Sequence, residues 1–143
     1  MSRQLTLTLK NDLAELARVS GVVDEFGERN AIPAAALFDL HLALDEILTN
    51  IVSYGYDDDH EHAIIVRLTL AAAQQPQRID VEVEDDGRPF NPLEAPEPAV
   101  NRPLQERPIG GLGIYLVRRV MDSLEYRRQQ GKNVLVMRKT LPA

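Results

Sequence analysis

The spacing of apolar residues changes several times along this chain between the period of a strand and that of a helix. The order of these changes is the feature that most limits the fold. Leucines alternate with polar residues over 5–10, which predicts a half-buried strand, and helical spacing follows over 13–26 and from 34 to about 53. Two further alternating runs, 64–70 and 79–83, are separated by a short proline-containing turn and predict a hairpin. The chain is therefore expected to begin with one strand, two helices and two paired strands.

An irregular stretch, a helix and a second hairpin are predicted for the rest of the chain. Residues 88–109 carry six of the nine prolines and little periodicity, and a loop of this length in so small a domain is usually functional, often a lid. Apolar spacing predicts a helix over 114–121 and strands over 124–128 and 134–138. This order predicts an α+β fold, a two-layer sandwich in which helices cover one face of a mixed, mostly antiparallel sheet.

Size, charge and composition limit the classes of protein to which the chain can belong. Its 143 residues suit a single domain, expected to span 1–143. A formal net charge of −6 argues against a broad nucleic-acid surface, and the absence of cysteine excludes disulfides and thiolate metal sites. No apolar run approaches the ~20 residues of a membrane span, and the N-terminus lacks a signal-peptide pattern. We therefore expect a cytoplasmic protein that binds neither membranes nor nucleic acid directly.

A carboxylate and an amide lie four residues apart in the second predicted helix. Glu46 and Asn50 share one helical face, because residues at i and i+4 do so. Their oxygens suit a hard cation such as Mg²⁺, and Glu46, which has no basic residue at i±4, is also a candidate general base. The alternative is an exposed polar face, which is the commoner meaning of such a pair when it stands alone.

The predicted strand 79–83 runs into the sequence Asp85-Asp86-Gly87. A carboxylate at a strand end can accept a hydrogen bond from a ligand amino group, and a glycine two residues later lets a flat ring approach the backbone. The alternative is an Asp-Gly turn, which is common in proteins.

A glycine-rich segment, Gly110-Gly111-Leu112-Gly113, precedes the third predicted helix. Free N–H groups and the positive dipole end at a helix N-terminus bind phosphate, and glycines remove side chains that would block its approach. The spacing matches neither a P-loop nor a dinucleotide-binding fingerprint. A flexible hinge with a helix cap is therefore the alternative.

The histidines and the paired arginines add no further site to this pattern. His41 falls in a predicted helix, whereas His60 and His62 fall in a polar turn, where solvent contact is commoner than metal binding. The pairs 118–119 and 127–128 are interpreted as surface charges.

Taken together and in this order, the three stretches resemble the N, G1 and G2 boxes of the GHKL ATPase superfamily, which has the Bergerat fold. More narrowly, they resemble the RsbW-type serine kinases and anti-sigma factors. The segment 83–92 (V-x-D-x-G-x-P-F-x-P) is similar to the G1 region of that family, and 110–117 (GGLGIYLV) is similar to its G2 segment. The resemblance covers nearly the whole chain.

This resemblance implies a role for each motif. Glu46 corresponds to the general base that activates the attacking hydroxyl, and Asn50 to the ligand of the Mg²⁺ that bridges the ATP phosphates. Asp85 corresponds to the acceptor of the adenine amino group, with Gly87 beside the ring. The implied phosphate-binding residues are Gly111, Leu112 and Gly113, and a lid over about 88–112 would offer Arg88, Arg102 and Arg107 to the phosphates.

The chain departs from the family pattern just after the first motif. Many relatives have a histidine or a basic residue shortly after the asparagine, where this chain has Ser53-Tyr54-Gly55-Tyr56. Less positive charge near the phosphates bears on the rate of phosphoryl transfer more than on binding, because such catalysis depends on positioning and charge stabilisation.

The resemblance implies an ATP- and Mg²⁺-dependent protein serine/threonine kinase. Such a kinase would phosphorylate a STAS-type anti-anti-sigma partner, sequester a sigma factor or a similar regulator, and form a homodimer. One alternative is a non-catalytic module that binds a partner in an ATP-dependent way. Another is a histidine-kinase-like ATPase domain, although no helical hairpin with a phospho-accepting histidine is evident. If the exposed polar face, the Asp-Gly turn and the hinge with a helix cap were all correct, the protein would be a scaffold that binds no nucleotide.

Overall fold

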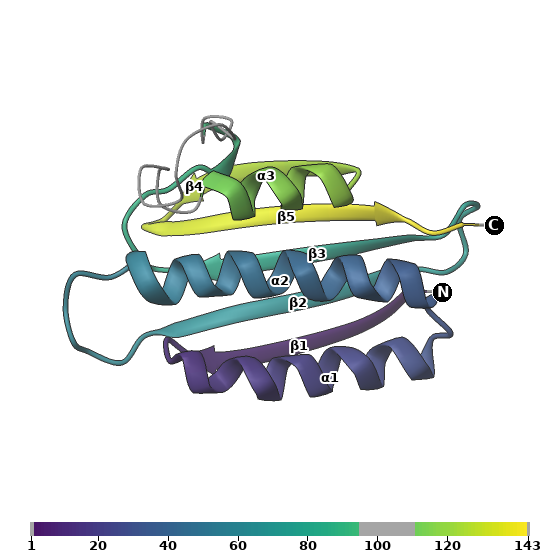
Figure 1. Cartoon of the computed structure of the whole chain (residues 1–143), viewed down its shortest axis with the longest axis horizontal. Coiled ribbons are helices and arrows are strands. Elements are labelled where there is room, and N and C mark those ends of the chain that lie inside the picture. The colour runs from purple at the N-terminus through teal and green to yellow at the C-terminus, as the bar shows by residue number, and fades with distance from the viewer. Residues whose placement is uncertain (1, 95–110, 143) are drawn as a thin grey trace.

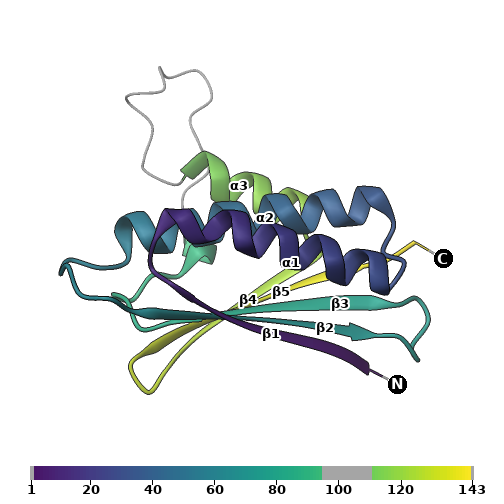
Figure 2. The ribbon, with the colours of Figure 1, turned by 90° about the horizontal axis from the view of Figure 1, so that it is seen from below.

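The structure, a computed structural model, describes residues 2–94 and 111–142 as two layers, a five-stranded sheet with helices packed on one face (Figures 1 and 2). This arrangement confirms the predicted α+β sandwich. The strands are β1 (Ser2–Lys10), β2 (Ala63–Ala71), β3 (Arg78–Asp85), β4 (Ser123–Gln129) and β5 (Lys132–Thr140). The helices are α1 (Leu16–Arg29), α2 (Ala34–Tyr54) and α3 (Gly111–Val120), with short 3-10 turns at Leu13–Glu15 and Pro92–Glu94.

The sheet has the strand order β1-β2-β3-β5-β4, and its four pairings are antiparallel throughout the described residues, where the sequence predicts a mixed sheet. The path of the chain explains this detail. Two helices separate β1 from β2. They bring the chain back to the end of the sheet where β1 finished, so β2 runs antiparallel to β1. A single helix separates β3 from β4, which would make those two strands parallel neighbours, but β5 lies between them.

The core lies between the sheet and the helical layer, to which all three helices contribute buried residues. Burial alternates strictly along β2 and β3, and on β3 the inward positions are Ile79, Val81, Val83 and finally Asp85. From the helical layer, α2 buries Leu40, Leu44 and Leu48 almost completely. A long amphipathic helix packed on a sheet fixes the positions of its side chains relative to the strands.

The β4–β5 hairpin turns at two residues with left-handed backbone conformation. Gln130 has φ 54° and Gly131 has φ 77°. Positive φ at both central residues is the requirement of the type I′ turn, whose twist matches that of paired strands. The predicted second hairpin is thus confirmed, and its turn fixes the register between β4 and β5.

The three sequence motifs meet at one end of the molecule. There α2 ends, β3 ends, α3 begins and the β4–β5 hairpin turns (Figure 1). Of the predicted lid, the structure describes the part up to Glu94 and the start of α3, and residues 95–110 lie outside the described part. None of the described helices is long and apolar enough to cross a membrane.

Candidate functional site

A cavity of about 410 Å³ lies between the last turns of α2, the end of β3 and the β4–β5 hairpin. Its volume is in the range of small-molecule sites, and its wall is mainly apolar with a few polar groups, as such sites usually are. The wall contains two of the predicted site residues, Asn50 and Asp85. The described lining residues are Ile47, Asn50, Ile51, Ser53, Tyr54, Gly55, Val83, Asp85, Arg88, Pro89, Phe90, Pro92, Tyr126, Asn133 and Leu135.

Asp85 is a carboxylic acid at an inward-facing position of β3, where the preceding inward-facing residues are apolar. It ends the inward series of β3 and is 5% exposed. Its Oδ1 accepts hydrogen bonds from the Gly87 N–H (2.8 Å) and from Asn133 Nδ2 (3.0 Å). Burial raises the pKa of the Asp85 carboxyl above its ordinary value in spite of these two donors. With Oδ1 occupied by the protein, Oδ2 is the oxygen suited to a donor on a ligand.

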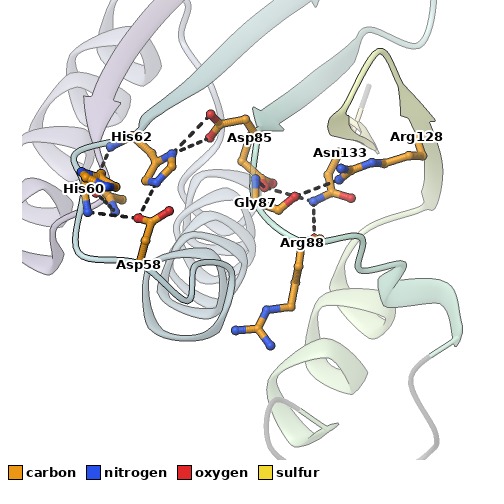
Figure 3. A network of polar contacts seen from close by, with 10 residues as sticks. Asp58, His60, His62, Asp85, Gly87, Arg88, Arg128 and Asn133 are labelled. Carbon is orange, nitrogen blue, oxygen red and sulfur yellow. Dashed lines mark hydrogen bonds and ion pairs between the residues drawn. The ribbon is translucent and has the colours of Figure 1, made fainter.

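Asn133 is a residue that the sequence analysis missed, and it makes four contacts within this site. Figure 3 shows it beside Asp85 and Arg88. It lies directly opposite Asp85 in the β3–β5 register and is 6% exposed. Its Nδ2 donates to Asp85 and to the Arg88 carbonyl (2.8 Å). Its Oδ1 accepts from the Phe90 N–H (3.2 Å) and the Tyr126 hydroxyl (2.5 Å). Because both ends of the amide are used, Asn133 orients the Asp85 carboxyl and holds the start of the segment after β3.

The turn after β3 has no room for a side chain at Gly87. A Cβ there would lie 2.6 Å from the Gly55 carbonyl oxygen and 3.0 Å from Asp85 Oδ1. The Arg88 N–H donates to the same Gly55 oxygen (2.8 Å), and Arg128 donates to the Gly87 oxygen (2.9 Å). Arg128 is exposed, as predicted, yet it helps to fix the turn. The close neighbour that requires glycine here is the protein backbone.

Glu46 and Gly113 are brought together from α2 and α3. A Cβ built on Gly113 would collide with the Glu46 carboxylate, so glycine is the residue that permits this contact. The Glu46 side chain is half-buried and lies at the first turn of α3, where helix N–H groups are free. The sequence predicts both residues as site residues, and the structure places them in contact although 67 positions separate them in the chain.

Asn50 lies one helical turn beyond Glu46, on the cavity wall. Its Nδ2 is buried and has no hydrogen-bond partner among the described residues. Buried polar atoms in proteins are almost always paired, so an orphaned amide on a cavity wall indicates a place for a polar ligand.

The glycine-rich motif lies partly inside the described structure. Helix α3 begins at Gly111, three residues before its predicted start, so Gly111, Leu112 and Gly113 form its first turn. Arg88 is exposed and lines the cavity. Two other candidates from the lid, Arg102 and Arg107, lie outside the described residues.

The uncharged stretch after Asn50 also reaches the cavity. Ser53, Tyr54 and Gly55 form part of its wall, and Arg88 supplies positive charge to the described lining. The described cavity wall therefore combines the Asp85 carboxyl with an unpaired amide and little positive charge, and Glu46 lies one helical turn before Asn50 on α2, beside the start of α3.

The structure corrects the interpretation of His62 as a solvent-exposed turn residue. Its side chain is 17% exposed and is paired with Asp58 and Asp86. The local sequence contains a weak signal, since Asp58 lies four residues earlier, but Asp86 lies 24 residues away. His60 is exposed, as expected. Within residues 2–94 and 111–142, no group of three or more His, Asp or Glu side chains is arranged to hold a metal ion.

Known sequences related to this chain are ATPase-domain proteins and protein kinases. Residues 9–139 match the family model described as the histidine kinase-like ATPase domain. The chain is 35% identical over 109 residues to the serine/threonine-protein kinase BtrW of Bordetella bronchiseptica, an alignment that covers 76% of this chain and 74% of BtrW. It is 28% identical over 102 residues to the serine-protein kinase RsbW of Bacillus mycoides, with 68% of this chain and 61% of RsbW covered. It thus spans less than two thirds of the RsbW relatives.

Solved structures share the fold at low sequence identity. The RsbU and RsbW domains of Rv1364c from Mycobacterium tuberculosis match with a TM-score of 0.70 and 17% identity, covering 99% of this chain and 34% of that chain. The histidine kinase domain from the Erythrobacter litoralis EL346 blue-light activated histidine kinase matches with a TM-score of 0.53 and 19% identity, covering 90% and 60%. At these identities the likeness concerns the fold alone, and it confirms the predicted GHKL-type sandwich.

The names of the related sequences agree with the enzyme class that the family resemblance implied, a protein serine/threonine kinase. The family match covers all the site residues discussed above, from Glu46 to Asn133. The chain belongs to the histidine kinase-like ATPase domain family, and its relatives there include the serine kinases RsbW and BtrW.

Proposed function

We propose that the protein is an ATP- and Mg²⁺-dependent protein serine/threonine kinase of the anti-sigma-factor type, built as one domain over 1–143. The contact between Glu46 and Gly113 is the observation that carries this proposal. It brings a carboxylate of α2 to the N-terminus of α3, where free N–H groups and the positive dipole end favour phosphate. A proton acceptor then lies beside the place where phosphates bind.

In this proposal, ATP lies along the cavity with its adenine at Asp85 and extends to the start of α3. Asp85 is buried, oriented by Asn133, and able to accept a hydrogen bond from the adenine amino group. At the other end, Gly111, Leu112 and Gly113 would hold the phosphates, and the lid over about 88–112, with Arg88, Arg102 and Arg107, would cover them. ATP would supply the phosphoryl group that is transferred to a protein hydroxyl.

In this proposal Glu46 is the general base and Asn50 is a ligand of Mg²⁺. Glu46 would accept the proton of the attacking serine or threonine hydroxyl, a role that requires a carboxylate near the phosphates. Asn50 would contribute its amide oxygen to Mg²⁺, which usually takes few protein ligands and completes its shell with water and phosphate oxygens. The unpaired Asn50 Nδ2 is a donor that a phosphate oxygen would satisfy, which supports a place for the phosphates beside this residue.

The protein partners follow from the relatives. RsbW and BtrW are named serine and serine/threonine-protein kinases, and the structure from Mycobacterium tuberculosis contains an RsbU domain with an RsbW domain. We propose that the substrate is a STAS-type anti-anti-sigma protein in the cytoplasm and that a sigma factor or similar regulator is sequestered. A homodimer is the proposed form.

Phosphotransfer measured directly tests the kinase proposal. Wild-type protein, labelled ATP, Mg²⁺ and a candidate STAS protein are mixed, and the rate of serine or threonine phosphorylation is followed. Glu46→Gln keeps the shape of the side chain and removes its basicity, so we expect the rate to fall by at least about a hundredfold. ADP affinity, measured by calorimetry, is expected to change by less than about threefold, since the general base acts on the acceptor hydroxyl.

A matched control lies next to Glu46 in the chain. Asp45 is exposed on the same helix, and Asp45→Asn removes one negative charge without touching the cavity. We expect this variant to phosphorylate the partner at the wild-type rate. Equal rates for wild type and Glu46→Gln would refute the role of Glu46, and an acid-labile phosphohistidine product would instead indicate the histidine-kinase-like alternative.

A second candidate function is a non-catalytic module that binds its protein partner in an ATP-dependent way. The uncharged cavity wall at Ser53, Tyr54 and Gly55 favours it, because missing positive charge near the phosphates slows transfer more than binding. Tight ADP binding, together with partner phosphorylation no faster than in Glu46→Gln, would support this candidate over the kinase.

A further inference from the structure

The loop between α2 and β2 runs beside the turn that ends β3, and two contacts join them. At its start, the Gly55 carbonyl accepts a hydrogen bond from the Arg88 N–H (2.8 Å). At its end, His62 is paired with Asp86. Asp86 lies between Asp85 and Gly87, whose N–H donates to the Asp85 carboxyl. The geometry around the buried carboxyl therefore depends on both contacts.

His62 lies between two carboxylates (Figure 3). Its Nε2 lies 2.8 Å from Asp58 Oδ1, and its Nδ1 lies 3.2 Å from Asp86 Oδ1. Carboxylate oxygens only accept hydrogen bonds, so each ring nitrogen must carry a hydrogen to make these contacts, and a ring with both hydrogens is an imidazolium cation. Both carboxylate contacts are therefore made together only when His62 is positively charged.

The rest of the environment holds the ring in place. The His62 ring stacks on the Tyr56 ring, with centroids 4.2 Å apart and planes 16° from parallel. The His62 N–H donates to Asn11 Oδ1 (2.8 Å), and the His62 carbonyl accepts from the Asn11 N–H (3.1 Å). The His62 backbone is therefore held by Asn11, which directly follows β1, and its side chain has little freedom to follow Asp86 if the turn moves.

We propose that His62 is a positioning residue of the nucleotide site: as an imidazolium between Asp58 and Asp86, it holds the turn after β3 in the orientation that presents the buried carboxyl to the adenine ring. This inference rests on the proposed function, because it assigns adenine to the Asp85 end of the cavity. His62 acts through Asp86 and the backbone, and is itself absent from the described cavity wall.

Charged and titratable groups around His62 favour the cation. Asp58, first, and then Asp86 raise the pKa of His62 above its ordinary value in spite of partial burial. The same pairing lowers the pKa of Asp58. Burial, with the charges of Asp85 and Asp86, raises the pKa of Tyr56, so this phenol stays neutral. Further out, the His60 N–H donates to Asp58, and Lys10 pairs with Glu61 at 3.6 Å.

The sign of the pH effect follows from the raised pKa. Below this pKa, His62 carries both ring hydrogens and both contacts are made. As the pH rises through the raised pKa, one hydrogen is lost, one contact with a carboxylate is broken, and the turn is released. Nucleotide affinity should therefore fall on the alkaline side. By reciprocity, bound nucleotide should raise the pKa of His62 further.

Calorimetric binding of ADP to wild type and His62→Gln, from about pH 6 to about pH 9 where histidines titrate, tests the proposal. The ratio of the two Kd values is the measured quantity, because the titration of the ADP phosphate cancels in it. At the acid end we expect wild type to bind about three- to tenfold more tightly, the effect of losing one charge-assisted contact. The ratio should approach one at the alkaline end.

His41→Gln is the matched control. His41 also pairs with an aspartate, since its Nε2 lies 2.7 Å from Asp24 Oδ1, and its side chain is 23% exposed. It joins α2 to α1 and does not line the cavity. This variant should bind ADP as wild type does at every pH.

A second measurement needs no variant. The His62 ring protons of the wild-type protein are titrated by NMR with and without ADP, and we expect a pKa above the ordinary histidine value that rises when ADP is bound. A His62 pKa that ADP does not move, or a Kd ratio that is constant with pH, would overturn the positioning role while leaving ATP binding in place. Wild-type protein that binds no ADP at any pH would refute the proposed function itself.

Discussion

Gly113 and Gly21 form a matched pair of helical glycines with opposite surroundings. A Cβ at Gly113 would collide with the Glu46 carboxylate, whereas a Cβ at Gly21, in the middle of α1, would meet nothing within 4 Å. We expect Gly113→Ala to displace Glu46 and to lower the phosphotransfer rate by roughly tenfold or more, since small misplacements of a catalytic group have large effects. The rate is measured with the STAS partner and Mg²⁺-ATP.

Gly21→Ala supplies the control for this prediction. Alanine replaces glycine favourably in a helix interior, so the free energy of unfolding should rise by about 0.5–1 kcal/mol without any change in phosphotransfer. If both variants transferred phosphate at the wild-type rate, the contact between Glu46 and Gly113 would have no part in catalysis.

Asn133 should matter for both stability and binding, because its amide connects Asp85, Arg88, Phe90 and Tyr126. Asn133→Ala removes all four contacts, although Asp85 keeps the Gly87 donor, and we expect the free energy of unfolding to fall by about 2 kcal/mol. The change also removes a donor that lowers the pKa of Asp85, so the pKa of that carboxyl should rise further and ADP should bind more weakly.

Urea unfolding and ADP calorimetry check the two halves of the Asn133 prediction. Tyr126→Phe is a milder change. It removes one hydroxyl donor to Asn133 and leaves the hydrogen bonds from Asn133 Nδ2 to Asp85 and Arg88 intact. It should lower stability less and keep most of the ADP affinity. An Asn133→Ala protein with wild-type affinity would show that Asp85 needs no support from β5.

The β4–β5 hairpin contains one residue whose backbone conformation its side chain does not favour. Gln130 has φ 54°, in the left-handed region, where asparagine is several-fold commoner than other non-glycine residues. Gln130→Asn creates the Asn-Gly pair preferred in type I′ turns, and we expect it to stabilise the protein by roughly 0.5 kcal/mol. Thermal unfolding measures the gain, and Gln129→Asn, placed in strand β4, should give none.

The helices and strands were predictable because each carries its own hydrophobic period. The alternation over 79–83 continues in the structure to the buried Asp85, and α2 begins directly after Pro33, as expected. The sheet pairing was less predictable, because the insertion of β5 beside β3 is decided by packing across the chain. A local pattern records which face of a strand is buried but not which strand lies next to it.

The site residues also fall into a predictable and an unpredictable group. Glu46, Asn50, Asp85 and the glycines were recognisable because each motif is contiguous in sequence. Residues that hold those motifs in place were not, because they contact partners far along the chain: Asn133 lies 48 residues from Asp85, and Arg128 lies 41 from Gly87. A polar residue near the end of a hairpin strand gives no local sign of such a contact.

Binding and stability should oppose each other at Asp85, and this affects the protein as a folded unit. Burial raises the pKa of Asp85 in the folded state above its unfolded value. Between these two pKa values the folded state holds a proton that the unfolded state has lost, so stability falls as the pH rises through this window. Once the pH exceeds both pKa values, the buried carboxyl is ionised in the folded protein and reduces its stability.

Asp85→Asn removes that charge and keeps an oxygen for the Gly87 and Asn133 donors. We expect the variant without nucleotide to unfold at a higher temperature than wild type at pH 7. Its amide, however, would present a donor to the adenine amino group, itself a donor, so nucleotide binding should be lost.

The order of the two melting temperatures should therefore reverse when nucleotide is added. Mg²⁺-ADP at about 100 times its Kd stabilises a protein by about 2.7 kcal/mol, which for a chain of this size is a Tm increase on the order of 10 °C. Wild type should show this increase and Asp85→Asn should not, while Asp45→Asn, at an exposed position, should respond as wild type does. If Asp85→Asn were less stable than wild type both with and without Mg²⁺-ADP, Asp85 would be a structural carboxyl. A reversal of the two melting temperatures on adding Mg²⁺-ADP is explained only by a carboxyl whose buried charge is retained for the ligand.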